Sequence, residues 1–379
     1  MPTKVYDVAV IGAGINGATA AYEFHKSNKS VVVFDKDGIA KGGSGAAGAF
    51  ISPKFSKQGE LKELIEDAFL YSMQFYTNYF PQHFMQKKLL HIAKDEDDAK
   101  MLRHYKNQTT LKLLTPSKET LQRLNLDIQS KEMVSLKSGL VDAQSMCKAL
   151  LENICYKTEE IDTLECKDGV WILNNKYKAQ SVILSTGAYN SLIDEPYIGI
   201  RGIWGHRVDL KGVEPLDSAL HQFVSIASLP NELCAVGATH NVHYHPQRTP
   251  LPYNIQEGRD ELLQKMRKTL QVDDIEIVQD YVGLRSGSTD YMPLVGKVVD
   301  SQKTVQKLKR RLERKDVAFD EFVYFENLFM INGNGGYGFV LAPYLAKMLR
   351  ELVLEKKEIT KQIAPARFFA RWARKGKNR

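Results

Sequence analysis

The first 35 residues contain a strand, a glycine loop, a helix and a second strand, and this unit narrowly limits the fold of the chain. Residues 5–11 form an apolar run that predicts a buried strand, and the glycine loop 12–17 follows it directly. Residues 18–25 predict a helix, and residues 31–34 predict a second strand that ends at Asp35. A strand, a glycine turn, a helix and a second strand in this order are typical of a dinucleotide-binding α/β sheet.

Each glycine of the loop 12–17 has a separate physical reason. Gly12 permits a tight turn, Gly14 lets the backbone approach a pyrophosphate, and Gly17 lets the helix pack close to the strand. The helix N-terminus adds unpaired N–H groups and the positive end of its dipole. Asp35 lies eighteen residues after Gly17, where its carboxylate can hold a ribose hydroxyl. The predicted contacts in this unit are Gly12, Ala13, Gly14, Ile15, Asn16, Gly17, Asp35 and Lys36.

Two further glycine-rich loops, at 42–48 and 333–338, favour FAD over a nicotinamide cofactor, which would normally need one phosphate loop. The first would let backbone pass near the ribityl chain and the flavin ring. The second would place a helix N-terminus where its dipole stabilises the N1–C2=O edge of a reduced flavin. Alternatively, 333–338 is only a loop of left-handed residues. The predicted contacts are Gly42, Gly43, Ser44, Ala47, Gly48, Asn334, Gly335, Gly336, Tyr337 and Gly338.

Length, cysteine content and charge limit the class of protein. A chain of 379 residues predicts two domains, and its four cysteines lack the spacing of a disulfide framework or a zinc site. We therefore expect a reducing cytoplasm, and no apolar segment is long enough to span a membrane. The net charge of +7 lies entirely in residues 361–379, which carry seven cations and no acid, because the remaining chain has 45 basic and 45 acidic residues.

The rest of the chain alternates between helical and strand periodicity. We expect helices at 60–80, 142–153 (capped by Asp142) and 256–270, a basic helical insert at 301–315, and a final helix from the third glycine loop to about 355. Expected strands lie at 89–92, 170–173, 177–184, 207–210, 223–227, 234–237, 322–325 and 328–331.

Three motifs resemble the D-amino-acid oxidase family of FAD enzymes over nearly the whole chain. Residues 182–189 look like its second dinucleotide-contacting strand, which implies cofactor contacts at Thr186 and Gly187. Residues 283–296 are similar to its Arg…Asp-x-x-Pro-x-x-Gly segment, and Arg201-Gly202 to its Arg-Gly-Gln strand. Ile203 stands where that strand has glutamine, so we assign it no contact. No Cys or His occurs in the C-terminal flavin segment, so non-covalent FAD is expected.

The resemblance implies an α/β fold in which a glutathione-reductase-type, Rossmann-like FAD domain interleaves with an α+β substrate domain on a mostly antiparallel sheet. We expect the FAD domain at 1–85, 136–200 and 281–360, the substrate domain at 86–135 and 201–280, and a basic tail at 361–379.

The resemblance also implies roles in the active site. Arg285 stands where the family binds the substrate carboxylate, and it is expected to contact the cofactor too; the alternative is a structural salt-bridge arginine. Asp290 is expected to order its turn. Lys54 and Tyr337 are weaker candidates, for a charge near the flavin and for the pocket border. No metal is expected, because the loop that carries His240, His243 and His245 has no acidic or cysteine partner nearby.

Finer matches resemble the C-terminal oxidase domain of the MnmC family of tRNA-modifying proteins: residues 43–53 and 234–239, the charged insert between Gly296 and Phe322, and the basic terminus. We expect no counterpart of that family's methyltransferase domain, and therefore only the oxidative half of its work. The implied reaction converts 5-carboxymethylaminomethyl(-2-thio)uridine at the wobble position of tRNA into aminomethyluridine and glyoxylate. The predicted tRNA contacts are Arg367, Arg371, Arg374, Lys375 and Lys377, with Phe368, Phe369 and Trp372 stacking on exposed bases.

Two other functions stay open at this point. An oxidase or dehydrogenase of free glycine, sarcosine or another small amino acid would use the same Arg285 without a basic tail. A flavin-binding subunit or RNA-binding protein without turnover is less consistent with the retained glycine loops. The sequence leaves the electron acceptor and the oligomeric state open.

Overall fold

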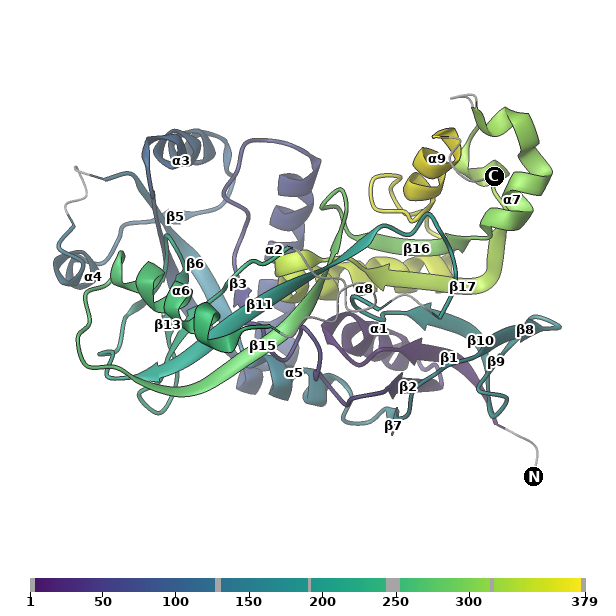
Figure 1. Cartoon of the computed structure of the whole chain (residues 1–379), viewed down its shortest axis with the longest axis horizontal. Helices are drawn as coiled ribbons and strands as arrows, with labels where there is room; N and C mark the ends of the chain where they lie inside the picture. Colours follow the sequence, from purple (N-terminus) through teal and green to yellow (C-terminus); the bar gives the residue numbers. More distant parts are fainter. Residues whose placement is uncertain (1–3, 127–130, 190–191, 243–252, 314–316, 376–379) are drawn as a thin grey trace.

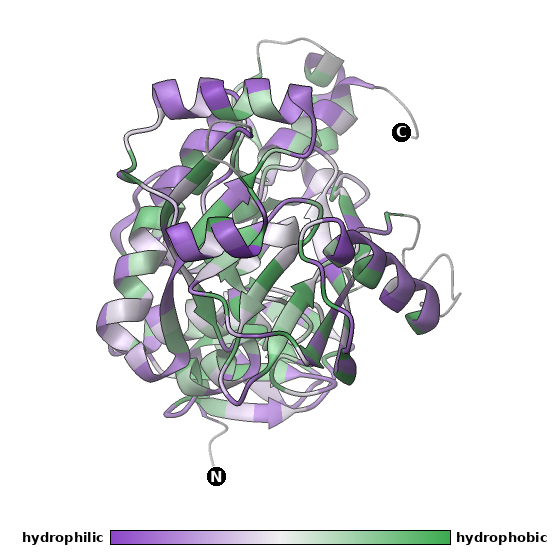
Figure 2. Cartoon of the chain, turned by 90° about the vertical axis from the view of Figure 1, so that its left-hand side faces the viewer, coloured by the Kyte–Doolittle hydropathy of each residue, from purple (hydrophilic) through white to green (hydrophobic). Residues whose placement is uncertain are grey.

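The computed structural model describes residues 4–126, 131–189, 192–242, 253–313 and 317–375. Two β-sheets lie next to each other along the long axis of the molecule, with helices between them and on their outer faces (Figure 1). Figure 2 shows that the green, apolar residues concentrate in the strands, whereas the helices turn purple, hydrophilic surfaces outward.

The first sheet contains the dinucleotide-binding unit. Its parallel core is flanked by the antiparallel β16 on one side, and an antiparallel hairpin extends β10. The strands, in spatial order, are β16 (Leu294–Val299), β17 (Tyr324–Asn332), β10 (Tyr177–Leu184), β1 (Val5–Ile11), β2 (Val31–Asp35) and β7 (Cys155–Thr158), with β9 (Val170–Leu173) and β8 (Leu164–Lys167) forming the hairpin.

Both faces of this sheet are buried, because successive side chains of a strand point to opposite faces. In β1, Val8 and Val10 pack with the helices α1 (Ile15–Lys26) and α8 (Gly338–Glu355) in one apolar cluster. Ala9 and Ile11 belong to a second cluster on the other face. A strand segment buried on both faces is apolar without alternation, as residues 8–11 are, and this pattern predicted the strand.

The second sheet is antiparallel except where β12 pairs with β4. One of its faces is covered by α6 (Ile255–Arg267), whose Leu262 and Met266 are fully buried against the sheet. In spatial order the strands are β15 (Glu276–Ser288), β11 (Ile200–Lys211), β14 (Cys234–Gly237), β13 (Ser225–Ser228), β12 (Ser218–His221), β4 (Phe84–Ile92), β6 (Met133–Val141) and β3 (Phe50–Ile51), with β5 (Leu113–Leu114) beside β6.

The remaining helices connect or cover the sheets. The long α2 (Glu60–Tyr79) is tied to the start of α8, because the Ser72 hydroxyl donates to the Val340 carbonyl (2.7 Å) and the Tyr76 hydroxyl to the Phe339 carbonyl (2.8 Å). The others are α3 (Glu96–Gln108), α4 (Lys118–Arg123), α5 (Ala143–Leu150), α7 (Ser301–Leu308), α9 (Ala366–Arg374) and the short 3₁₀ turns η1 (Pro81–His83), η2 (Lys309–Glu313), η3 (Phe319–Glu321) and η4 (Gly335–Tyr337).

The predicted fold class is confirmed, and most predicted elements are present. Asp142 caps α5 by accepting from the Ser145 N–H (3.0 Å), and Asn174 and Asn175 make the β9–β10 turn with φ of 50° and 52°. Two predictions were wrong. The strands expected at 322–325 and 328–331 are one strand, β17, in which Asn327 has a φ of 50°. The helix that ends at Glu355 is not the last, because α9 follows it.

Candidate active site

A cavity of about 750 Å³ lies at the carboxyl ends of β1, β2, β10 and β17 and extends to the second sheet. Ligands bind at this edge of parallel sheets because the loops that follow the strands converge there. All predicted cofactor contacts line the cavity except Ala13 and Gly17, which lie behind its wall. Their roles toward a ligand remain predictions.

The glycines of the first loop are required by close backbone contacts. Gly12 has a φ of 107°, and a Cβ on it would lie 2.3 Å from the Ser185 carbonyl oxygen. A Cβ on Gly17 would lie 1.8 Å from the Gly12 oxygen, so the helix can approach the strand only without a side chain here. Gly14 faces the Ser44 hydroxyl, which accepts from the Ile15 N–H (2.9 Å) at the start of α1. The loop therefore leaves the helix N-terminus open to the cavity.

Asp35 organises the adjoining turn. Its carboxylate accepts from the N–H groups of Ala13 (2.7 Å), Asp37 (3.0 Å) and Gly38 (3.0 Å). Carboxylate oxygens accept more than one hydrogen bond, so these contacts leave capacity for a ribose hydroxyl. Next to it, the Lys36 ammonium lies 4.3 Å from the centre of the Tyr189 ring. Both side chains line the cavity at the end that a dinucleotide's adenosine would occupy.

The second glycine loop, 42–48, lies between the two sheets. A Cβ on Gly43 would lie 2.6 Å from the Leu284 carbonyl oxygen, so only glycine lets the loop pass β15 this closely. The Arg207 guanidinium of β11 donates to the Ala47 carbonyl (2.7 Å) and fixes the loop from the other side. A Cβ on Gly42 would meet no atom within 4 Å, because its open side faces the cavity.

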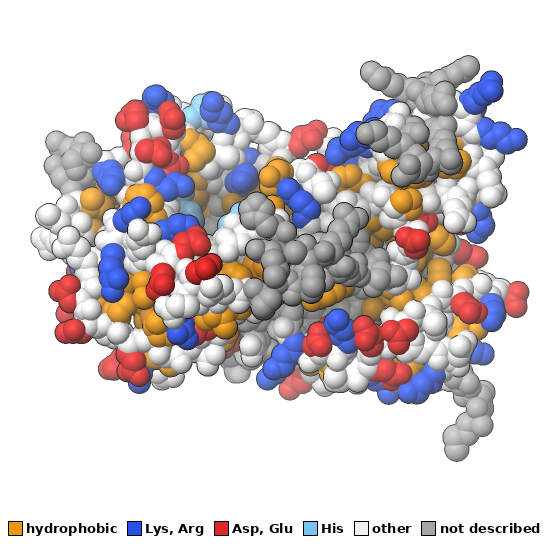
Figure 3. Space-filling view, viewed as in Figure 1, with side chains coloured by type: hydrophobic (Ala, Val, Ile, Leu, Met, Phe, Trp, Pro, Cys, Tyr) orange, Lys and Arg blue, Asp and Glu red, His pale blue; other side chains and the backbone are white. Residues whose placement is uncertain are grey.

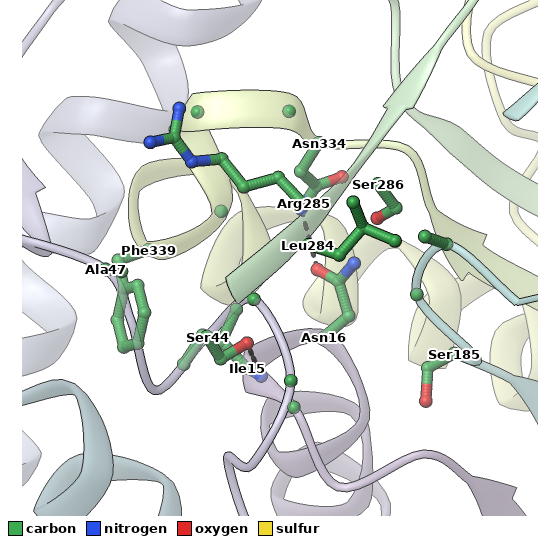
Figure 4. A pocket seen from close by; sticks show the side chains of 18 of the residues that line it. Ile15, Asn16, Ser44, Ala47, Ser185, Leu284, Arg285, Ser286, Asn334 and Phe339 are labelled. Atoms are coloured by element: carbon green, nitrogen blue, oxygen red, sulfur yellow. Dashed lines mark hydrogen bonds between the residues drawn. The ribbon is translucent and has the colours of Figure 1, made fainter. Parts of the chain in front are cut away.

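The third glycine loop joins the first across the cavity. The Asn334 side-chain amide donates to the Asn16 side-chain oxygen (2.6 Å), as Figure 4 shows. Asn334 is 6% exposed, and its own side-chain oxygen has no partner among the described residues. Gly335 has a φ of 56°, and α8 begins at Gly338 with no acidic side chain in its first turn. Between β10 and this loop, Thr186 and Gly187 line the cavity, and Gly187 accepts from the Asn332 amide (2.9 Å).

These observations fit an extended FAD molecule. The α1 N-terminus suits a pyrophosphate, the open face of Gly42 leaves room for a ribityl chain, and the α8 N-terminus provides N–H groups for the ring. A nicotinamide cofactor would normally need only the first of these glycine loops, so the other two favour FAD.

Arg285 extends from β15 over η4 (Figure 4). Its guanidinium fits only because Gly205 on the neighbouring strand has no side chain, since a Cβ there would lie 2.0 Å from Nη2. Nη2 donates to the Thr239 carbonyl (3.2 Å), and burial lowers the pKa of Arg285 below its ordinary value. No carboxylate pairs with Arg285 among the described residues, so the salt-bridge alternative finds no support there.

Lys54 and Tyr337 come together although they are far apart in sequence. The Lys54 ammonium lies 5.6 Å from the centre of the Tyr337 ring, and Tyr337 lines the cavity. Burial lowers the pKa of Lys54 and raises that of Tyr337 to about 12. Lys54 itself is absent from the cavity wall, whereas its neighbours Pro53 and Phe55 line it.

A histidine pair that the sequence did not reveal lies near the second sheet's end of the cavity. His91 and His221 are opposite each other on β4 and β12, with ring centres 4.7 Å apart, and His221 lines the cavity. Burial lowers the pKa of His221 to about 4, with a further contribution from Lys94. The two residues are 130 positions apart, and nothing in the sequence pairs β4 with β12.

The structure corrects the predictions for the basic terminus. Phe368 and Phe369 are 4% and 0% exposed in the apolar cluster on the face of the first sheet opposite α1 and α8, so they cannot stack on bases. The Arg367 guanidinium, which was predicted to bind phosphate, instead donates to the Asp290 carboxylate (3.0 Å) and to the Met292 carbonyl (2.7 Å). Residues 366–374 of the expected tail form the packed helix α9, and the exposed side chains among the tail's described residues are Lys361, Gln362, Arg371, Arg374 and Lys375.

Asp290 orders its turn as expected, since it accepts from the Met292 N–H (3.3 Å) and the Ser288 hydroxyl (3.2 Å). Lys377, His243 and His245 lie outside the described residues, whereas His240 lines the cavity near Arg285. Among the described residues, no group of three His, Cys, Asp or Glu side chains could hold a metal ion. None of the helices in the described ranges is long and apolar enough to cross a membrane.

Comparisons with known proteins agree with the cavity. The sequence profile of the family described as FAD dependent oxidoreductase matches residues 7–352. The tRNA 5-methylaminomethyl-2-thiouridine biosynthesis bifunctional protein MnmC of Campylobacter fetus subsp. fetus is 22% identical over 393 residues, which cover 99% of this chain and 61% of that protein. MnmC of Leptospira interrogans serogroup Icterohaemorrhagiae serovar Lai is 23% identical, with 98% and 62% covered. The chain thus spans about three-fifths of these curated relatives.

Two solved structures share the fold. Glycine oxidase from Geobacillus kaustophilus has a TM-score of 0.73 and 20% identity, covering 94% of this chain and 96% of its own. L-proline dehydrogenase from P. horikoshii has a TM-score of 0.74 and 19% identity, covering 97% and 98%.

Proposed function

The chain belongs to the FAD-dependent oxidoreductase family, and from this premise we propose that it oxidises the glycine unit of a modified tRNA uridine. The substrate is the 5-carboxymethylaminomethyl(-2-thio)uridine of the wobble position. A hydride leaves the glycine methylene and a proton leaves the secondary amine, which gives an imine. Water adds to the imine carbon and the carbon–nitrogen bond breaks, so that glyoxylate leaves and aminomethyluridine remains.

FAD, when bound without a covalent link, supplies the two-electron acceptor for that hydride. We propose that the first glycine loop with Asp35 and Lys36 holds its ADP part, and that the other two loops hold the ribityl chain and ring. The proposed contacts are Gly12, Ala13, Gly14, Ile15, Asn16, Gly17, Asp35, Lys36, Gly42, Gly43, Ser44, Ala47, Gly48, Thr186, Gly187, Arg285, Asn334, Gly335, Gly336, Tyr337 and Gly338.

The observation that carries the proposal is the largely unpaired guanidinium of Arg285 at the cavity. Its partly buried guanidinium donates only to the Thr239 carbonyl among the described residues, which leaves other N–H groups for a ligand. A charge in a poorly solvated site favours an anionic partner strongly. The planar fork of arginine matches a carboxylate through two parallel hydrogen bonds, which would orient the glycine methylene.

Lys54 would help to keep the substrate amine neutral, which hydride loss requires. A positive charge near an amine disfavours its protonation and lowers its pKa. Arg285 acts in the same direction. Tyr337, with its pKa raised to about 12, keeps its proton at neutral pH and can donate a hydrogen bond at the cavity border.

The choice of tRNA is supported by the MnmC relatives, whose name includes tRNA 5-methylaminomethyl-2-thiouridine biosynthesis. A tRNA substrate would also place the protein in the cytoplasm. The second candidate is an oxidase or dehydrogenase of free glycine, sarcosine or another small amino acid. It is favoured by the position of Arg285, which requires only an amino-acid carboxylate.

We further propose the domain division stated above, with FAD-binding segments 1–85, 136–200 and 281–360, substrate-binding segments 86–135 and 201–280, and 361–379 apart. Strands β6 and β15 of the second sheet cross the boundaries at 136 and 281.

The deciding experiment mixes the FAD-loaded protein with tRNA that carries the carboxymethylaminomethyl group. We expect bleaching of the flavin absorbance, and aminomethyluridine and glyoxylate as products. Glycine and sarcosine are tested in parallel. Bleaching by the amino acids without any product from tRNA would reject the proposed substrate in favour of the second candidate.

A further inference from the structure

We propose that Tyr291 and Arg201 form a stacking platform for a nucleobase beside the active-site cavity, and that cations of α9 and η2 extend it as an RNA-binding surface. This inference rests on the proposed tRNA substrate and names where the RNA would contact the protein. It replaces the stacking role that the sequence suggested for Phe368 and Phe369.

Tyr291 is held with its ring in solvent. Its side chain is 66% exposed, more than any other large hydrophobic residue of the described ranges. Its φ is 67°, which is strained for a bulky residue and persists only where the surroundings impose it. Here the Tyr291 N–H donates to the Ser288 carbonyl (3.3 Å), and the Asp290 carboxylate accepts from the Met292 N–H (3.3 Å). The fold therefore keeps a costly aromatic surface in water.

Arg201 lies over one side of this ring, with its guanidinium carbon 5.1 Å from the ring centre. Its Nη2 donates to the Ser288 carbonyl (3.3 Å), and its buried Nε–H has no partner among the described residues. An arginine beside an aromatic ring is the arrangement with which proteins stack unpaired bases and neutralise the adjoining phosphate.

The platform is next to Arg285. In the β11–β15 pair, Ile203 is opposite Arg285 and Arg201 is opposite Gly287. Residues two apart on a strand share a face, so Arg201 and Arg285 are diagonal neighbours on the same face of the sheet. Burial and the charges of Arg285 and Arg201 lower the pKa of His240, which lines the cavity. A nucleotide whose modified group reaches Arg285 would thus have its neighbour within reach of Tyr291.

A basic surface continues from the platform. Asp290, directly before Tyr291, is shared by Arg367 and Arg371 (3.0 and 3.2 Å), which leaves one positive charge in excess. The exposed Arg374 ends α9 and the exposed Lys375 follows it, and η2 adds the exposed Lys309 and Arg310. Buried Phe369 and Leu312 belong to one apolar cluster, which fixes α9 against η2.

Figure 1 shows α7 and α9 at one corner of the molecule, and Figure 3 shows Lys and Arg side chains gathered there. Charge complementarity alone would also fit an acidic peptide. The exposed aromatic face next to an arginine favours RNA, because bases stack on such a face whereas carboxylate side chains do not.

The test measures binding of 3′-fluorescein-labelled tRNA to the FAD-loaded protein at several KCl concentrations. We expect Tyr291→Ala to weaken binding about 5- to 150-fold, the range that stacking of one base supplies, and Tyr291→Phe to bind like the wild type. The double variant Arg374→Glu/Lys375→Glu should reduce the slope of log K against log salt by about 1.5. The control Lys112→Glu/Lys211→Glu changes the net charge equally at two exposed positions, one directly before β5 and one at the end of β11, and should leave the slope unchanged.

Bleaching of the flavin by the free nucleoside carboxymethylaminomethyluridine separates the two proposals, because this probe has the reacting group without the RNA. We expect it to bleach wild type and Tyr291→Ala equally. If wild type oxidises the tRNA while Tyr291→Ala binds tRNA like wild type, the platform is wrong and the proposed function stands. If wild type neither binds tRNA nor bleaches with the nucleoside, the proposed function fails. Displacement of tRNA by poly-glutamate at equal charge concentration would assign the surface to an acidic protein.

Discussion

The glycine loop 12–17 and the basic segment 361–379 are the two most distinctive regions of the sequence. The structure has the contacts predicted for the loop but not the exposed side chains predicted for the segment. In the loop, the predicted close contacts are present: Gly17 against the Gly12 carbonyl, and the helix N-terminus open to the cavity. In the basic segment, the aromatic residues are buried and Arg367 is paired with Asp290. Gly12 and Gly17 are each required by a close backbone contact, whereas the burial and ion pairing of the segment's side chains depend on which partners the fold brings to them.

Among the substitutions that test this comparison, we expect the largest effect on stability from one in the glycine loop 12–17. Gly17→Val places atoms where the Gly12 oxygen already lies, so we expect loss of the folded FAD-bound protein, at a cost above about 5 kcal/mol. Flavin content and thermal unfolding measure it. Gly42→Ala is the matched control for thermal unfolding only, because its Cβ would meet no protein atom within 4 Å but would point into the cavity that the flavin is proposed to occupy. Equal behaviour of the two variants would break the argument that backbone contact defines the loop.

Arg285→Met tests a residue of the cavity wall that belongs to neither of these two regions. We expect kcat/KM for the amine substrate to fall about 1000-fold, roughly 4 kcal/mol, because a carboxylate loses a bidentate, poorly solvated partner. Steady-state kinetics with tRNA and with sarcosine measure it. The surface variant Arg103→Lys should change nothing, and unaltered kinetics of Arg285→Met would remove Arg285 from the site.

Phe369→Ala tests the correction in the basic segment. The side chain is fully buried and packs edge-on against Phe322 (ring centres 4.9 Å apart), so we expect a loss of about 3 kcal/mol in the free energy of unfolding. Urea unfolding measures it, with the exposed Leu70→Ala as control. Wild-type stability combined with weaker tRNA binding would show that the original stacking interpretation was right.

The smallest effect is expected for Asp290→Asn, which removes the charge that holds α9. Asp290 and Arg367 are 18% and 9% exposed, and we expect a loss of about 2 kcal/mol. Burial opposes ionisation, but the hydrogen bond and charge of Arg367 keep the pKa of Asp290 below its ordinary value. This stabilisation is therefore present above the unfolded pKa of about 3.9 and is lost as the pH falls through the folded pKa.

Unfolding curves of wild type and Asp290→Asn should accordingly converge below about pH 4. Asp97→Asn removes a carboxylate that is 96% exposed and should have no measurable effect at any pH. A pH-independent difference between wild type and Asp290→Asn would show that its hydrogen-bond geometry, not its charge, holds α9.

Sequence prediction succeeded where a residue's role is set by its near neighbours. The β1 strand, the N-cap Asp142 and the Asn174-Asn175 turn need only local hydrophobicity, capping and left-handed φ. It failed where the partner is distant. Nothing local shows that Asn327 continues one strand, or that His221 lies opposite His91.

The candidate site shows the same division. The three glycine loops were found because each is a short backbone motif, and Arg285 was found through a family resemblance. Gly205, whose missing side chain makes room for the Arg285 guanidinium, carries no local signal at all. The platform of Tyr291 and Arg201 joins residues ninety positions apart that meet only through the register of β11 with β15.

By itself, the sequence determined that this chain folds around a dinucleotide, because glycine spacing and an apolar strand act through backbone geometry within a few residues. Only the tertiary structure decided which charges and rings are available to a partner. A side chain's burial and ion pairs depend on atoms that folding brings close together. For this reason Phe369 lies in the apolar core, Arg367 is paired with Asp290, and the ring of Tyr291 is exposed to solvent.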